Sequence, residues 1–457
     1  MSDPGKGMQA LYQNLVSVLG AVIVTISAVL FLTVFALDLF GLHVNPYIGI
    51  VFFLIIPGLF VLGLLLIPLG MLLERRRRAR GVSREWPRID LSNARHRRLT
   101  IAVLLLTIVN GLIVSLAAYR GVEYMDSTAF CGQVCHEVME PEFVAYQDGP
   151  HSRVRCVQCH IGPGAPWFVR AKISGARQVL AVLFNTHSRP IPTPVHNLRP
   201  ARDTCEQCHW PEKFHGDKLN VRREYADDEA VTESTATIQV HIGGGSEKNG
   251  TPTGIHWHVS SSNQIEYVFV DEKRDDIPYV RLTMANGEVR EYFAEGATPE
   301  KVAAGGRRTM DCVDCHNRPT HPFAPSPERA VDAAIAAGEI PRSLPFVRRE
   351  AVSALKVNYP SREQALSEIA SRLETFYRNS PPGNPGIRAE DLSRAIAGAQ
   401  RLYSRNVFPQ MKVSWGTHPS NLGHLDAPGC FRCHDDNHKT GDGKVISQDC
   451  SLCHEIQ

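Results

Sequence analysis

The twelve cysteines of this 457-residue chain form six pairs, and a histidine directly follows the second cysteine of every pair. Two residues separate the cysteines in five pairs, and three separate them in the first. C-x-x-C-H is the pattern in which two thiols bond the vinyl groups of a porphyrin and the histidine reaches the iron. The sequence therefore predicts six covalent c-type haems. The motifs are Cys131, Cys135, His136; Cys156, Cys159, His160; Cys205, Cys208, His209; Cys312, Cys315, His316; Cys430, Cys433, His434; and Cys450, Cys453, His454.

Paired cysteines can also bind zinc or form disulfides. The last two pairs have the spacing of a four-thiolate zinc ribbon, and twelve thiols in an oxidising compartment could form disulfides. Neither use requires a histidine after every second cysteine. With 19 histidines in 457 residues, six such placements by chance have odds of roughly one in 10⁸, which favours haem.

The other axial ligands must come from the eleven further histidines of the outer part. Histidines close to a motif, or paired where alternation predicts a strand, are the better candidates: His151, His321, His438, His256 and His258. The weaker candidates are His187, His196, His215, His241, His418 and His424. This supply is sufficient for bis-histidine coordination, but sequence alone does not assign partners.

Met139 follows the first motif by three residues. A thioether ligand raises the potential of a haem relative to two histidines, which suits a haem where electrons enter. A methionine packed on the porphyrin edge fits the same spacing. The spacing is compatible with both an iron ligand and a packing role for Met139.

The elements that position these motifs begin with a membrane anchor. Three runs without formal charge, 15–37, 47–73 and 99–119, are each long enough to cross a hydrocarbon layer of about 30 Å. The loop between the second and third runs carries 10 Arg against 3 acids, and such loops stay in the cytoplasm. We therefore expect a cytoplasmic N-terminus and a haem region in the periplasm of a bacterium, anchored in the inner membrane.

The overall charge of +2 excludes a strongly basic nucleic-acid binder. The predicted fold is mainly α, with three transmembrane helices, a haem-packed region, a small antiparallel β insertion and a helical segment. Alternation and an Asn-Gly turn predict the insertion; capping residues Ser326 and Ser361 predict helices, and another is expected over 389–403. The expected parts are 1–120 (anchor), 121–230 (haems 1–3), 231–300 (β insertion) and 301–457 (helices and haems 4–6).

The first motif lies eleven residues beyond the third run, so its haem is held within about 35 Å of the membrane. A lipid-soluble carrier is the natural electron donor there. A periplasmic or outer-membrane-directed redox protein is the expected acceptor, and the haems carry the redox chemistry.

The stretch from Cys131 through Met139 and His151 to the second motif resembles the NapC/NirT family of membrane-anchored multihaem quinol dehydrogenases. The three-helix start is most similar to inner-membrane cytochromes of metal-respiring bacteria. The resemblance implies quinol oxidation, with menaquinol expected, Met139 as an iron ligand and Lys172 at the quinol site. The family usually has two residues between the first cysteines and a methionine two after the histidine, whereas this chain has three and three.

Other readings stay open. From the residues alone, Lys172 is a solvated or propionate-pairing side chain. The chain could be the electron-wiring subunit of a larger respiratory complex, with the quinol site elsewhere. It could instead be a multihaem reductase of a small nitrogen or sulfur substrate, which would require one iron without a distal ligand. The excess of histidines argues against that last reading.

Overall fold

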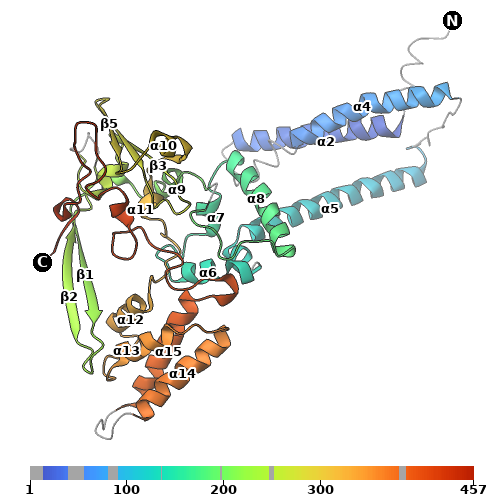
Figure 1. Cartoon of the computed structure of the whole chain (residues 1–457). Helices are drawn as coiled ribbons and strands as arrows, with labels where there is room; N and C mark the ends of the chain where they lie inside the picture. The colour runs from blue at the N-terminus through green and yellow to red at the C-terminus, as the bar shows by residue number, and fades with distance from the viewer. Residues whose placement is uncertain are drawn as a thin grey trace. The chain divides into compact units, whose positions relative to one another are not determined.

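The computed structural model describes residues 14–39, 56–80, 91–134, 136–195, 198–245, 252–379 and 387–456. Its secondary structure is mostly helical with small antiparallel sheets (Figure 1). The chain forms two compact units, one from residues 1–123 and 163–173 and the other from residues 124–162 and 174–457. The finer division into four parts remains a prediction.

The first unit contains α2 (Leu15–Leu39), α4 (Ile56–Ala79) and most of α5 (Ala94–Met125). Helices α2 and α4 approach closely at two glycines: a Cβ added to Gly20 would lie 2.7 Å from the carbonyl oxygen of Gly63. The Ser17 hydroxyl donates to the carbonyl of Ile67 at 2.9 Å. Small residues and interhelical hydrogen bonds are typical of helix packing in membranes.

The three expected spans fall on these three helices. Among the described residues, the stretch Gly58–Arg77 is long and apolar enough to cross a membrane, and Leu15–Leu30 is apolar but shorter. The third run lies within α5, and the start of the second lies outside the described residues. The three-span topology stays a prediction.

In the second unit, short helices hold the haem motifs. The first motif starts in the π-helical turn η2 (Phe130–Val134) and continues into α6 (His136–Gln147). The others lie at short helices because a two-residue spacing places both thiols on one turn. These helices are α7 (Cys156–His160), α9 (Ala201–Cys205), α11 (Cys312–Cys315), η6 (Gly429–Arg432) and η7 (Cys450–Leu452). The longer helix α8 (Ala165–Leu183) holds no motif; it starts in the first unit and ends in the second.

Two antiparallel sheets accompany the motifs. One has the order β1-β2-β7, from Lys218–Tyr225, Glu233–Val240 and His454–Ile456. The other has the order β5-β4-β3-β6, from Val289–Phe293, Tyr279–Met284, Asn263–Phe269 and Gly306–Thr309. The predicted β4–β5 hairpin is present, and Gly287 takes a φ of +80° in its turn. The sheets extend beyond the expected insertion at both ends.

The strand expected around His256 and His258 is wrong. Residues Ile255–Val259 form a 3-10 helix, η4, with the amide of Trp257 donating to the carbonyl of Gly254 at 3.1 Å. In a strand, residues two apart face the same side. In a helix of about three residues per turn they point in different directions, so the two histidines can serve different partners.

The helical part consists of α12 (Pro327–Ala336), α13 (Val347–Leu355), α14 (Arg362–Arg378) and α15 (Ala389–Asn406). The expected caps are present: Ser326 accepts from the amide of Arg329, and Ser361 accepts from that of Gln364. These helices bury one large apolar cluster that includes Val331, Ile369 and Leu373. The remaining short helices are η3 (Pro211–Lys213), α10 (Pro299–Ala304) and η5 (Pro409–Met411).

Candidate haem-binding sites

Five of the six motif histidines lie opposite a second histidine. The distances between ring centroids are 6.3 Å for His160 and His321, 6.0 Å for His209 and His151, 6.4 Å for His316 and His256, 5.8 Å for His434 and His258, and 6.1 Å for His454 and His424. Each of these five motif histidines has a different partner. The five partners come from segments far from their motifs in the sequence, except for His424, which precedes the fifth motif.

This spacing fits an iron held between two imidazoles. A metal lies about 2 Å from a ligating imidazole nitrogen, and the ring centre lies about 1 Å behind that nitrogen. Two imidazoles on opposite faces of one iron therefore have centroids about 6 Å apart. Rings packed directly on each other would be closer, as His424 and Phe431 are at 4.1 Å.

Four of the partner histidines are oriented by a hydrogen bond at Nδ1. His151 donates to the carbonyl of Pro319 at 3.0 Å, and His256, His258 and His321 donate to the carbonyls of Ile242, Ile255 and Glu142 at 2.8 Å each. A backbone carbonyl can only accept, so the proton is fixed on Nδ1. Nε2 is left with the lone pair that a metal requires.

The surroundings favour the neutral form of three of the paired rings, His160, His258 and His316. Burial lowers the pKa of His160, and the neighbouring His321 lowers it further. Burial likewise lowers the pKa of His258 and of His316, the latter with help from His256 and His209. Neutral imidazole is the form that binds metals.

The structure reverses the order of two candidate ligands. His438 is buried, its Nδ1 bonds to a carboxylate oxygen of Asp435 at 2.9 Å, and its Nε2 bonds to the carbonyl of Ile277 at 2.7 Å. Neither nitrogen is left for iron. His424, the weaker candidate by sequence, faces the sixth motif histidine instead.

The first motif is only partly described. Cys135 and the side chain of His136 lie outside the described residues, as does His196. Met139 is half-buried on α6. His187, ranked low by sequence, has both ring nitrogens buried without a hydrogen-bond partner, which makes it a further candidate ligand. In the other unit, the Lys172 ammonium lies 4.8 Å from the centre of the Phe168 ring.

Thiols of successive motifs lie close enough to shift one another's pKa. A hydrogen bond from Cys131 lowers the pKa of Cys156 to about 6, and a hydrogen bond from Cys205 lowers that of Cys312. In three further pairs, burial raises the pKa of one thiol and a neighbouring thiol raises it further. Cys208 has this effect on Cys159, and Cys430 has it on both Cys315 and Cys453. The links join motifs 1 to 2, 2 to 3, 3 to 4, 4 to 5 and 5 to 6.

The eleven described cysteines are free thiols. Within the described ranges, no group of three or more histidine, cysteine or acidic side chains could hold a metal ion by itself. The four cysteines of the last two motifs, all of them described, therefore do not form the four-thiolate cage of a zinc ribbon.

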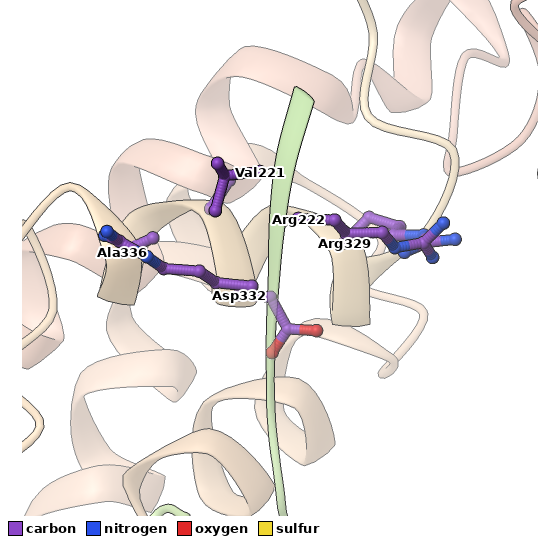
Figure 2. A pocket seen from close by; sticks show the side chains of 7 residues that line it. Val221, Arg222, Arg329, Asp332 and Ala336 are labelled. Carbon is purple, nitrogen blue, oxygen red and sulfur yellow. The ribbon is translucent and has the colours of Figure 1, made fainter. Parts of the chain in front are cut away.

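A surface hollow between β1 and α12 has no part in these sites. Figure 2 shows its lining, which includes Val221, Arg222, Arg329 and Asp332. The charged groups are already paired: both arginines lie within 3.0 Å of Glu224, and Asp332 pairs with an arginine of α13 at 2.7 Å. No motif residue lines this hollow, so it is not a substrate site at an iron.

Comparison with known proteins identifies the family of this chain. The N-terminal region model of the NapC/NirT cytochrome c family matches residues 93–191. The cytochrome c-type protein ImcH of Geobacter sulfurreducens is 43% identical over 448 residues, covering 97% of this chain and 88% of that protein. This chain belongs to the NapC/NirT family of multihaem c-type cytochromes. No solved structure matches it.

The cytochrome is therefore a membrane-associated electron-transfer protein with covalently bound c-type haem. The family match covers the third apolar run, the first two motifs and Lys172. The haem supplies reversible one-electron chemistry when it is attached. The motif cysteines would attach it, and the paired histidines would hold its iron.

Proposed function

We propose that this cytochrome oxidises membrane quinol at the periplasmic face and conducts electrons through six haems to a periplasmic or outer-membrane-directed acceptor. The observation that carries the proposal is the set of five histidine pairs at one spacing, combined with thiols that adjoin in sequence order. A continuous row of low-spin sites suits conduction. A reductase would need an iron with an open position.

Each of haems 2 to 6 takes one histidine pair: His160 with His321, His209 with His151, His316 with His256, His434 with His258, and His454 with His424. For haem 1 we propose Met139 as a ligand. His187 is the candidate for the opposite face because its ring nitrogens are buried and unbonded. A histidine–methionine haem has a higher potential than its bis-histidine neighbours, which suits the haem that first accepts electrons.

The donor is proposed to be menaquinol, with Lys172 at its binding site. Lys172 follows the second motif on α8, within the part matched by the family model. An ammonium there can donate hydrogen bonds to a quinol oxygen and stabilise negative charge as protons leave.

Reduction by a quinol analogue tests this function. The detergent-solubilised protein is mixed with a reduced menaquinone analogue, and haem reduction is followed by absorbance. We expect reduction without any partner protein. If the purified chain stays oxidised and is reduced only when a partner subunit is added, the quinol site lies elsewhere and the wiring-subunit reading replaces this one.

The role of Lys172 is tested separately. Lys172→Met should slow reduction by the quinol analogue and leave reduction by dithionite unchanged. Lys213→Met is the matched control, because the Lys213 ammonium also lies over an aromatic ring, 5.2 Å from the centre of Trp210. Equal rates for the two variants would remove Lys172 from the quinol site.

A further inference from the structure

Arg432 joins the fourth and fifth haem motifs. It precedes the second cysteine of the fifth motif, and Asp314 occupies the same place in the fourth. Arg432 Nη2 donates to the backbone carbonyl of Asp314 at 2.6 Å. The same guanidinium donates to the carbonyls of Gly429 at 2.8 Å and Arg274 at 3.2 Å. One side chain thus fastens its own motif to the preceding one.

The Asp314 carboxylate anchors the other side of this junction. Its side chain is only 2% exposed. It accepts hydrogen bonds from the Tyr267 hydroxyl at 2.6 Å and from Arg308 Nε at 2.9 Å, and Arg274 Nη1 lies 3.5 Å away. Buried charges persist only when paired and hydrogen-bonded. The fourth motif therefore carries a fixed negative charge beside its haem.

The positive charge of Arg432 reaches both attachment sites. Arg432 directly precedes Cys433 in the sequence, and its guanidinium bonds to the carbonyl of Asp314, the residue that directly precedes Cys315. Its cation is therefore close to the second attachment point of each haem. The two opposite charges at this junction shift the potential of a nearby iron in opposite directions.

The corresponding residues of two other motifs make local bonds. Gln207 donates to the carbonyl of Asp203 at 2.7 Å, and Gln158 accepts from the amide of Arg155 at 3.0 Å. Each stays within its own segment. A bond between motifs is thus not a general consequence of the C-x-x-C-H turn.

We propose that Arg432 and Asp314 form a clamp that holds haems 4 and 5 in fixed relation and tunes their potentials. The carboxylate favours oxidised iron and the guanidinium favours reduced iron. This inference rests on the proposed six-haem chain. Both residues are positioning residues, because they act through the motifs and not on a substrate.

The test is a redox titration of the purified full-length protein, followed by electron paramagnetic resonance. Asp314→Asn removes a negative charge and should raise the potentials of the adjacent haems. Arg432→Met removes a positive charge and should lower them, and it should weaken the magnetic coupling between two haems. Arg432→Lys should restore part of both signals. Four of the six potentials should not move.

Gln207→Met is the matched control at the same motif position and should leave haems 4 and 5 unchanged. If Asp314→Asn fails to bind haem, Arg274→Gln serves as a milder variant. The backbone carbonyl at position 274 still accepts the hydrogen bond from Arg432. It should lower the same potentials. Shifts of one sign in all variants, or unchanged potentials with six haems attached, would overturn the clamp. Neither readout uses quinol, so failure of quinol oxidation is a separate result.

Discussion

The helical part from Ser326 to Asn406 and the haem-binding part around it form their interiors differently. The helical part buries large side chains such as Ile369, Leu373 and Tyr403 to 1% exposure or less and contains no haem motif. Near the last two motifs, by contrast, Leu422 and Leu452 are 61% and 50% exposed. We expect bound porphyrins to cover such apolar side chains near the motifs.

The two parts therefore depend to different degrees on protein side chains and on haem for their stability. The helical part has caps, periodic apolar positions and a complete protein core, so its sequence alone specifies it. The motif part has hydrogen-bonded turns, paired histidines and smaller apolar clusters, such as the one that contains Ile265, Tyr267 and Val280. We expect bound haem to supply the rest of its interior.

The largest effect should follow from producing the full chain without haem attachment. We expect the motif segments to exchange amide hydrogens rapidly and to be cleaved readily, because the porphyrins that complete their core are missing. The helices α12 to α15 should remain protected. Hydrogen exchange with mass spectrometry measures both parts at once. Equal protection of the two parts would show that the haem-binding part folds on its protein contacts alone.

The second prediction concerns His424 and His438. His424→Ala should convert one low-spin haem to a high-spin form, visible by electron paramagnetic resonance, because His424 faces the sixth motif histidine. His438→Ala is the matched variant and should leave every haem low-spin. It should cost about 1–3 kcal/mol in unfolding free energy through its two lost hydrogen bonds. Loss of a low-spin haem in His438→Ala instead would reverse the assignment.

Sequence predicted the attachment sites because their chemistry is local. The caps at Ser326 and Ser361 and the turn at Gly287 were equally readable, since each depends on residues within a few positions. Proximity in sequence favours His438 over His424, but His438 bonds to Asp435 and a distant carbonyl, and His424 is the histidine that faces the sixth motif. Long-range pairing is decided by tertiary structure.

The strand expected at residues 255–259 failed for a related reason. Alternating apolar residues fit both a strand and a short 3-10 turn, and no local signal distinguishes them. The fold selects the turn where Gly254 has a φ of +65° and the His256 ring bonds to Ile242. The long helix α8 is not predicted from the sequence. Charged residues interrupt its apolar positions, and the surrounding stretch has few apolar runs.

A third prediction concerns the helical core. Leu373→Ala should destabilise the protein by about 2–5 kcal/mol, because it removes a fully buried side chain and leaves a cavity. Haem potentials should not change, since this core contains no motif. Leu219→Ala, at a position 58% exposed on β1, should stay within about 0.5 kcal/mol. Denaturant unfolding and a redox titration provide the two readouts. A shift in potential for Leu373→Ala would couple the two parts.

The smallest effect is expected at a helix cap. Ser361→Ala removes the acceptor for the amide of Gln364 and should cost about 1 kcal/mol. Ser361→Asp keeps an acceptor and should restore most of the loss. Both are measured by the same unfolding experiment. A null effect of the alanine would mean that tertiary packing, and not the cap, fixes the start of α14.

The most direct test of the account is to count haems on the purified chain. Intact-protein mass spectrometry with a haem assay should give six covalent haems per polypeptide, and near-infrared magnetic circular dichroism should show five bis-histidine sites. Fewer than five haems, or histidine pairs that do not bind iron, would contradict the proposed chain of haems.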